Sequence, residues 1–382
     1  MGFFNRRREK GAVIMQTART AEKNILDLKY RPLSSVDMKL YDALRQNVPI
    51  IDAAINKTVR LIGGFDVICS DKRAQKGLDD FLRNVNVGLS QTGINSFIDS
   101  FFANLLTYGN AAGEILVGKH TGEIVGLANA EIADLTVEEG NPPVDRVYYI
   151  NTPKGPVKAK YPQFILFGAL NPPPGSPYGV SVLRGLPCIS SILLRIYECI
   201  EQNFDRVGNV RYAVTYKPSG ETDKAYAGER AAQIASEWSR GMAAAKDGQI
   251  RDFVAVGDVD IKVIGADNKM LDTEIPVRQL LEQIIAKLGI PPFMLGISWN
   301  VSERMSAQQA DILTSELEFY RRQLTPVIER IARAYLASAG ETCDISVKWE
   351  SINLQDEVEL AGARLSNARA MEIEQKLEGV NV

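Results

Sequence analysis

Apolar side chains first recur at helical spacing after Pro49, and the repeat stops at Gly63 and Gly64. The positions in this stripe are Ile50, Ile51, Ala54, Ile55, Thr58 and Ile62. The pattern predicts a helix, followed by a short strand over Phe65–Cys69. The preceding residues are polar and mixed in charge, so we expect residues 1–45 to form a flexible N-terminal arm.

A second amphipathic helix is predicted from Ile94 to near Gly109, and a run of short strands follows it. The predicted strands cover Ala111–Val117, Glu123–Leu127, Ala133–Val137, Arg146–Ile150 and Phe164–Phe167. Turn residues such as Thr121 and Gly122 separate them. Short connections favour antiparallel pairing, so this part of the chain predicts an α+β module.

A rigid proline-rich segment, Asn171–Pro177, then opens a long helix predicted over Val180–Val207 and closed by Gly208. Its apolar positions form a stripe that includes Leu186, Ile189, Leu193, Ile196 and Ile200. Such a stripe is a seam for a neighbouring helix. The pattern alone leaves open whether that neighbour belongs to the same chain or to another subunit.

The remaining chain predicts a small insert, two more helices and a final strand. The insert contains strand Val210–Lys217, helix Ala225–Ala245 and strands Phe253–Val256 and Ile261–Ile264. Helix Ile275–Leu288 ends at Gly289-Ile290-Pro291-Pro292, and loop Phe293–Val301 leads to a helix over Ser306–Leu336, where Pro326 should introduce a kink. Strand Asp344–Trp349 precedes a polar helical tail that reaches Val382.

The composition is that of a folded protein: of 382 residues, 45% are apolar and 24% are charged, which excludes disordered and fibrous classes. No run approaches the roughly eighteen apolar residues of a membrane helix, so we expect a soluble protein without a membrane partner. The net charge of −3 disfavours a protein that grips nucleic acid by neutralising many phosphates. A net charge of −3 is still compatible with weak contacts to DNA that slides past the protein.

Four cysteines, Cys69, Cys188, Cys199 and Cys343, lie far apart in the sequence and contain no Cys-x-x-Cys pair. We therefore expect buried, reduced thiols rather than disulfides or a metal site, and folding inside a cell.

Catalytic patterns are weak. Gly113–Lys119 satisfies the Gly-x4-Gly-Lys part of a phosphate-binding loop, but His120 stands where Mg²⁺ needs a hydroxyl ligand, so we interpret this segment as a hairpin. His120 is the only histidine, and nothing else supports a triad or metal centre around it. Asp258–Asp260 is interpreted as a hairpin turn. We expect no catalytic residues, no metal and no cofactor, and thus not an enzyme.

Three stretches, in the same order, resemble the portal proteins of long-tailed bacteriophages of the HK97 type. They are Leu106–Ile115 before a strand pair, Pro172–Ser181 before the long helix, and Ile284–Gly296. The third stretch is followed by a polar loop and by a helix carrying Leu324–Glu329 with its internal proline. The resemblance covers roughly residues 45–355.

The resemblance implies a portal-like fold, with an α/β wing, long stem helices, a small α/β clip and a short C-terminal helical region, assembled as a ring of usually twelve subunits. Mapped by order, the wing covers 46–179 and 306–350, the stem helices 180–207 and 274–290, the clip 208–266, and the tunnel loop region 291–305. Residues 351–382 leave room only for a short or truncated crown.

The same resemblance implies a channel at one capsid vertex for packaging, retention and ejection of double-stranded DNA, without sequence preference. The implied partners are terminase, a head-tail adaptor, and the major capsid and scaffolding proteins; assembly would occur in the host cytoplasm and the product would reside in the virion. Channel candidates are Ser298, Trp299, Asn300, Glu303 and Arg304, and a solvated helix connection is the alternative for that loop. A non-channel capsid adaptor and, on the Gly113–Lys119 pattern, an NTP-binding packaging enzyme are the competing functions.

Overall fold

The structure is a computed structural model that describes residues 35–141, 145–208, 211–217, 225–246, 258–264, 273–297 and 303–352. The described residues divide into two compact units. The first contains residues up to Ser190 and those from Leu281 onward, and the second covers Ser191–Leu280. The structure is mixed helix and sheet, as the α+β prediction required.

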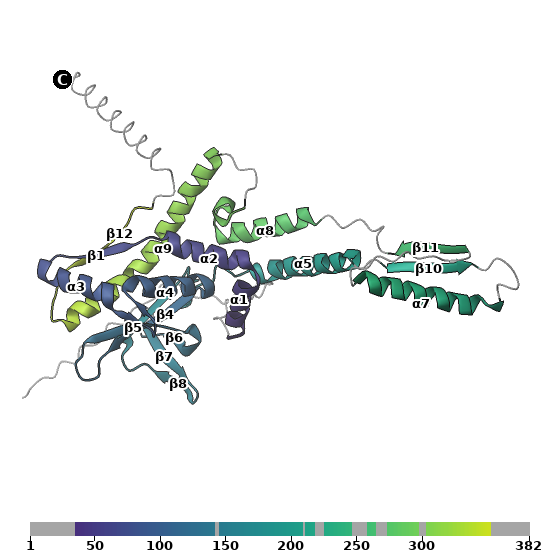
Figure 1. Cartoon of the computed structure of the whole chain (residues 1–382). Helices are drawn as coiled ribbons and strands as arrows, with labels where there is room; N and C mark the ends of the chain where they lie inside the picture. Colours follow the sequence, from purple (N-terminus) through teal and green to yellow (C-terminus); the bar gives the residue numbers. More distant parts are fainter. Residues whose placement is uncertain are drawn as a thin grey trace, which may run out of the picture. The chain divides into compact units, whose positions relative to one another are not determined.

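The first unit begins earlier than the sequence predicted, because α1 (Ser35–Asn47) lies within the segment assigned to the arm (Figure 1). Tyr41 and Leu44 of this helix are buried, which fixes it on the fold. The arm boundary at residue 45 is therefore wrong, and residues 1–34 lie outside the described part. Helix α2 (Pro49–Leu61) and strand β1 (Phe65–Cys69) follow as predicted.

Helix α3 (Lys72–Asn84) is not among the elements expected from the sequence. The Asp71 side chain caps it by accepting a hydrogen bond from the Arg73 N–H, and Ala74, Leu78 and Leu82 form its buried stripe. Both signals are present in the sequence.

The main sheet of the first unit has five strands in the order β3-β2-β5-β4-β9. Their bounds are β2 Asn86–Val87, β3 Gln91–Thr92, β4 Asn110–Val117, β5 Ile124–Ala130 and β9 Ile165–Ala169. All pairings are antiparallel except that of β2 with β5. Helix α4 (Ile94–Tyr108) packs on β4 and β5.

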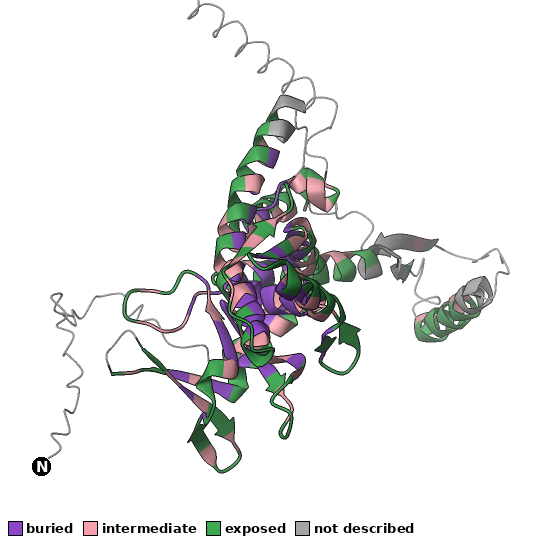
Figure 2. Ribbon diagram, turned by 90° about the vertical axis from the view of Figure 1, so that its left-hand side faces the viewer, coloured by how far each residue is buried: buried purple, intermediate pink, exposed green. Residues whose placement is uncertain are grey.

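The core of the unit is centred on α4, where Phe97, Phe101 and Phe102 are all completely buried. Figure 2 shows the buried residues, in purple, gathered in the interior of the helices and strands. The sheet accepts the rings because it carries glycines: a Cβ on Gly113 would lie 2.7 Å from the Phe97 ring, and one on Gly168 would lie 3.1 Å from the Phe101 ring.

A second, three-stranded antiparallel sheet consists of β6 (Leu135–Glu139), β7 (Arg146–Thr152) and β8 (Gly155–Lys158). The short 3-10 helices η1 (Ile132–Asp134) and η2 (Pro162–Phe164) flank it along the chain. Val137, Tyr148 and Phe167 join its inner face to β9 in one buried cluster.

Helix α9 (Glu303–Ser338) and strand β12 (Ile345–Trp349) complete the first unit. The helix runs through Pro326, as predicted; the predicted kink stays a prediction. Strand β12 returns to pair with β1 in antiparallel register, from Phe65 opposite Trp349 to Cys69 opposite Ile345. Beyond residue 352 the predicted helical tail lies outside the described part.

The cysteine prediction is wrong in two respects. Cys69 and Cys343 form a disulfide, with their Cα atoms 6.2 Å apart, because the register of β1 with β12 places them side by side although 274 positions separate them. Cys188 and Cys199 are free thiols, but both are exposed rather than buried.

The second unit contains most of α5 (Leu186–Gly208), the hairpin of β10 (Arg211–Lys217) and β11 (Asp258–Ile264), and α7 (Ala227–Lys246) beside β10. The hairpin pairs seven residues of each strand. Asp258 pairs with Lys217 and Asp260 with Thr215, so the predicted turn at Asp258–Asp260 is in fact the start of β11. The predicted strand Phe253–Val256 lies outside the described residues.

Candidate functional site

Two stretches singled out in the sequence, Leu106–Ile115 and Pro172–Ser181, lock together through their glycines. Gly109 ends α4 in a left-handed conformation with φ +73°, and a Cβ there would lie 2.3 Å from the Val180 carbonyl carbon. A Cβ on Gly179 would lie 2.3 Å from the Gly109 carbonyl oxygen. Only glycine at both positions permits this approach of the two backbones.

Buried hydrogen bonds fix the same contact. The Asn110 side chain, which is completely buried, accepts from the Gly179 N–H at 2.8 Å. The Ser181 hydroxyl donates to the Thr107 carbonyl at 2.6 Å and accepts from the Leu183 N–H. The buried side chains of Asn110 and Ser181 are thus paired, which keeps their burial from being destabilising.

The same contact lies just before the long helix. The N–H of Val180 donates to the Leu170 carbonyl and that of Val182 to the Leu106 carbonyl, and these bonds hold a segment that is not helical. Helix α5 starts at Leu186, directly after Gly185 with φ +93°, and the predicted start at Val180 is wrong by six residues. The interlocked segments therefore anchor the first turn of α5.

Tyr178 ties the same segment to the three-stranded sheet. Its hydroxyl accepts a hydrogen bond from the Val137 N–H at 2.7 Å, and its ring meets Phe167 edge to face. Burial raises the pKa of Tyr178 above its ordinary value, although the hydrogen bond from Val137 opposes part of the rise. The phenol is therefore a neutral structural group.

The predicted seam of α5 differs along its length. Leu186 and Leu193 are buried within the chain, at 0% and 1% exposure. Ile189, Ile196 and Ile200 are half-buried and keep apolar surface that another element can cover. The helix also exposes Ile192, Tyr197 and Phe204, the last at 59%.

Helix α8 (Glu274–Leu288) and the segment after it also match the sequence expectation. Ile284, Ile285 and Ile290 are buried, and Gly289 ends the helix at φ +71°. The Pro-Pro motif opens a 3-10 turn, η3 (Pro292–Leu295), which Gly296 closes at φ +79°. The loop expected from Phe293 onward therefore begins with this 3-10 turn.

Of the five channel candidates, Ser298, Trp299 and Asn300 lie outside the described residues. Glu303 and Arg304 were predicted in the loop, but they belong to the first turn of α9. The loop between η3 and α9 is therefore shorter than predicted, because the helix begins three residues before Ser306.

The phosphate-loop pattern at Gly113–Lys119 is a hairpin, as interpreted from the sequence. Gly113–Val117 lies in β4 and pairs with β5, and Gly118 and Gly122 close the turn by a hydrogen bond from the Gly122 N–H to the Gly118 carbonyl. No helix start follows the turn, so its backbone N–H groups have no helix N-terminus to share with a phosphate. The glycine at position 113 has a packing role instead, because the Phe97 ring leaves no room for a Cβ there.

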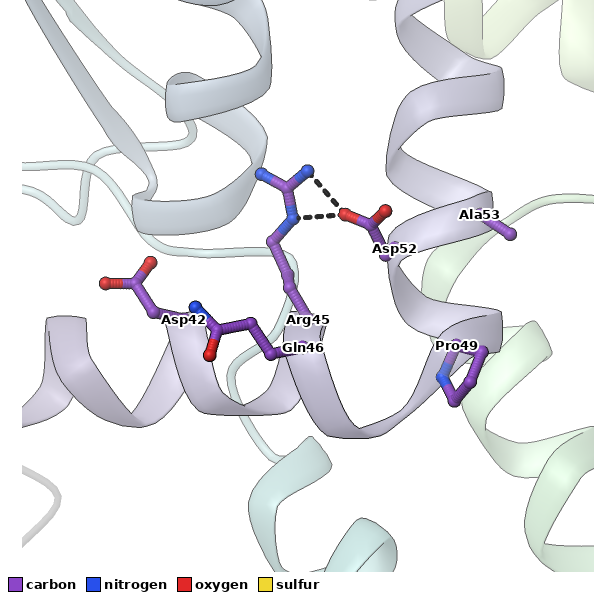
Figure 3. Close-up of a pocket in the computed structure, with 6 residues that line it drawn as sticks. All are labelled: Asp42, Arg45, Gln46, Pro49, Asp52 and Ala53. Carbon is purple, nitrogen blue, oxygen red and sulfur yellow. Dashed lines mark hydrogen bonds and ion pairs between the residues drawn. The ribbon is translucent and has the colours of Figure 1, made fainter.

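A cavity of about 590 Å³ opens where α1 meets α2 (Figure 3). It is lined by Asp42, Arg45, Gln46, Pro49, Asp52 and Ala53. Arg45 donates from Nε and Nη2 to one oxygen of Asp52, at 2.8 and 2.6 Å, and from Nη1 to Thr107 of α4. The network joins α1, α2 and α4 just before the interlocked glycines.

Tyr108 completes this network by donating its hydroxyl to Asp42 at 2.5 Å. Burial, followed by the hydrogen bond to Asp42, raises the pKa of Tyr108 well above its ordinary value. The protonated phenol of Tyr108 is thus the donor and Asp42 the acceptor of a bond that joins α1 to the end of α4. No local sequence pattern points to this pair, because 66 positions separate its members.

Across the described residues, no group of three or more His, Cys, Asp or Glu side chains could hold a metal ion. None of the described helices is long and apolar enough to span a bilayer.

One comparison with known proteins shows a family. A family model described as phage portal protein matches residues 66–379. Among solved structures, the chain is similar to one in the virion of a native gene transfer agent particle, with a TM-score of 0.62 at 16% identity over 90% of this chain and 91% of that chain. No curated protein matches.

The chain is also similar to two further solved structures. One is a chain in the neck of the native gene transfer agent particle, computed with C12 symmetry, with a TM-score of 0.60 at 16% identity over 86% of this chain and 88% of that chain. The other is an HK97 family phage portal protein from Corynebacterium diphtheriae, with a TM-score of 0.41 at 14% identity over 81% of this chain and 94% of that chain.

Proposed function

This chain belongs to the phage portal protein family, and we propose that it is one subunit of a closed ring through which double-stranded DNA enters and leaves a capsid. The observation that carries the proposal is the family match over residues 66–379. The fold shared with a chain of a particle neck computed with C12 symmetry supports a ring of about twelve subunits. Portal proteins are structural, so the chemistry of DNA pumping would belong to a partner enzyme such as terminase.

The regions of the ring subunit follow from the order of elements. Residues 46–179 and 306–350 would form the wing, 180–207 and 274–290 the stem, 208–266 the clip, and 351–382 a short crown. The separate compact unit Ser191–Leu280, with its own hairpin and helix, supports a clip that folds apart from the wing. The anchor at Gly109 and Gly179 supports a wing that holds the base of α5 rigidly.

The stem would form its subunit contacts through α5. Ile189, Ile196 and Ile200 retain apolar surface in the single chain, whereas Leu186 and Leu193 are already covered. Burial of half-exposed isoleucines between adjacent copies would stabilise the ring by about 25 cal/mol for each Å² of apolar surface removed from water. A head-to-tail contact of this kind closes into a ring when the rotation between copies permits.

The tunnel loop would lie within 291–305, with Ser298, Trp299, Asn300, Glu303 and Arg304 facing the DNA. Its charges are mixed and the whole chain has a net charge of −3. A ring of such loops surrounds a duplex without neutralising many phosphates, and tight phosphate contacts would oppose sliding. Deleting Ser298–Ser302 should leave rings intact and impair DNA packaging or retention. Loss of the rings would instead identify the loop as a structural connector.

Negative-stain microscopy of the purified protein tests the central proposal. We expect closed rings with an axial hole wide enough for a DNA duplex. A protein that stays monomeric under assembly conditions would contradict the ring, and rings without such a hole would favour a capsid adaptor. Docking of terminase, of a head-tail adaptor and of capsid and scaffolding proteins can then be measured on the isolated rings.

A further inference from the structure

The ribbon formed by β1 and β12 has two edges of different character. On the β1 edge, Gln75 of α3 accepts from the Cys69 N–H at 2.6 Å and donates to the Val67 carbonyl at 2.9 Å. A glutamine amide offers one donor and one acceptor side by side, as the backbone of a neighbouring strand does. Gln75 therefore takes the place of a third strand at Val67 and Cys69 and blocks strand addition there.

The β12 edge is open within the described part of the chain. The Ser70 N–H donates to the Asp344 carbonyl, and the Glu350 N–H donates to the Gly64 carbonyl. Because hydrogen-bonded pairs alternate along an antiparallel ladder, the residues of β12 with even numbers direct their backbone N–H and C=O groups toward β1. Ile345, Val347 and Trp349 consequently direct their N–H and C=O groups away from β1. Among the residues that the structure describes, these outward backbone groups have no hydrogen-bond partner.

This edge lacks the usual protection against strand addition. The five residues of β12, Ile-Ser-Val-Lys-Trp, contain no proline, and Lys348 is their only charged side chain. Ser346 and Lys348 are exposed, and the three outward residues are half-exposed. An extended peptide can therefore reach the edge and form main-chain hydrogen bonds with it.

We propose that residues Ala12–Thr17 of the same chain bind the open edge of β12 as a third strand. This segment, Ala-Val-Ile-Met-Gln-Thr, is uncharged and free of proline, and it contains three β-branched residues. Its six residues are enough to pair along the five residues of β12. The rest of the segment before Ser35 is interrupted by charges, as is the segment after residue 352, so neither offers an equivalent strand.

The length of the chain supports the same molecule as the source. Seventeen residues separate Thr17 from Ser35, where the described fold begins. Fully extended, they span up to about 55 to 60 Å, which exceeds the diameter expected for a domain of this size. A tethered segment competes with free copies at an effective concentration in the millimolar range. Intramolecular addition is therefore favoured.

Hydrogen exchange of the backbone amides of β12 tests the proposal. In the full-length protein we expect the outward amides of Val347 and Trp349 to be protected by about 100-fold or more relative to an unpaired amide. The combined variant Val13→Ser, Ile14→Pro and Met15→Ser should lose at least about tenfold of that protection. The inward amides of Ser346 and Lys348 should stay protected in both proteins, which shows that the ribbon remains folded.

A matched control places the same kinds of substitution elsewhere in the arm: Ala21→Ser, Glu22→Pro and Lys23→Ser. This control should exchange like the parent. Outward amides that exchange freely in the parent would overturn the proposal, since the edge would then be unpaired. Protection that is unchanged in the Val13, Ile14 and Met15 variant would overturn it as well, because another segment would cover the edge.

A cross-link identifies the source of the strand. Cysteines introduced by Ile14→Cys and Ser346→Cys, with Cys188→Ser and Cys199→Ser to remove the exposed thiols, should join on mild oxidation into a product that migrates as a monomer on a denaturing gel. A dimer-sized product would overturn addition within one chain. Neither experiment requires DNA or a closed ring, so both can fail while the channel proposal stands.

Discussion

Arg321, on the long helix α9, donates from Nε and Nη2 to the Ile62 carbonyl oxygen at 2.9 and 2.6 Å. The arginine is only 3% exposed, and its guanidinium also lies 5.1 Å from the Trp349 ring centre. Ile62 is the C-cap of α2, so this side chain satisfies a carbonyl at the end of that helix. One residue thus links α2, α9 and β12.

We expect Arg321→Met to lower the free energy of unfolding by about 2 to 4 kcal/mol, because the buried Ile62 carbonyl would lose both of its donors. Chemical denaturation of the purified protein measures the change. The control is Arg333→Met, whose ion pair with Glu329 involves a 65% exposed arginine side chain and should contribute less than about 1 kcal/mol. Equal effects of the two variants would contradict the importance of the Ile62 contact.

Because Cys69 and Cys343 form a disulfide, we expect two of the four cysteines to react with a thiol reagent in the native protein. Alkylation of the native protein should modify Cys188 and Cys199, and reduction should release Cys69 and Cys343 as well, as mass spectrometry can count. The double variant Cys69→Ser and Cys343→Ser should unfold with a free energy lower by about 2 to 5 kcal/mol. Four thiols that react before reduction would show that the bond does not form under the conditions tested.

Gly179→Ala should disrupt the anchor of α5, since the added Cβ would lie 2.3 Å from the Gly109 carbonyl oxygen and from the Leu170 backbone. The backbone has to move, and we expect a loss of at least about 3 kcal/mol or insoluble protein. Gly228→Ala in α7 is the matched control, because its Cβ would meet nothing within 4 Å. Melting temperatures of the two variants provide the comparison, and a Gly179→Ala protein as stable as the parent would refute the close approach.

Stability should fall as the pH rises from 10 to 12. Burial raises the pKa of Tyr320 from 10.0 to about 12, with a smaller contribution from Glu316. The unfolded chain loses its phenolic protons first, so the stability present below pH 10 is lost as the pH approaches 12. Tyr320→Phe should flatten part of this decline in thermal melts at pH 9, 10 and 11. Tyr226→Phe, at a 57% exposed position, should leave the slope unchanged.

The apolar seam of α5 should be needed for assembly. Ile196→Asp together with Ile200→Asp should abolish rings in micrographs, because the contact between copies would have to bury two unpaired carboxylates. Gln202→Asp, at an exposed position of the same helix, should assemble normally. Circular dichroism identifies a variant that has lost its helices, and rings formed by the double variant would remove α5 from the interface.

Much of the fold could be predicted from periodicity. Helices α2, α4 and α8 and strands β1 and β4 lie close to their predicted positions, because one face of each is buried and its apolar residues repeat accordingly. The same local signals identified the hairpin at Gly118–Gly122 and a family resemblance that the comparisons confirm. Helix α3 also has such a stripe, in Ala74, Leu78 and Leu82, so its position too is encoded locally.

The sequence by itself thus determined most of the helical and extended segments, and the family to which the chain belongs. Only the tertiary structure decided the start of α5, the strand at Asp258–Asp260 and the disulfide. The segment before Leu186 is held outside α5 by bonds from Val180 to Leu170 and from Val182 to Leu106. Asp258 becomes a strand residue because Lys217 lies opposite, and Cys69 meets Cys343 because β12 returns to β1. These outcomes depend on hydrogen bonds and contacts between residues far apart in the chain, which a local pattern does not encode.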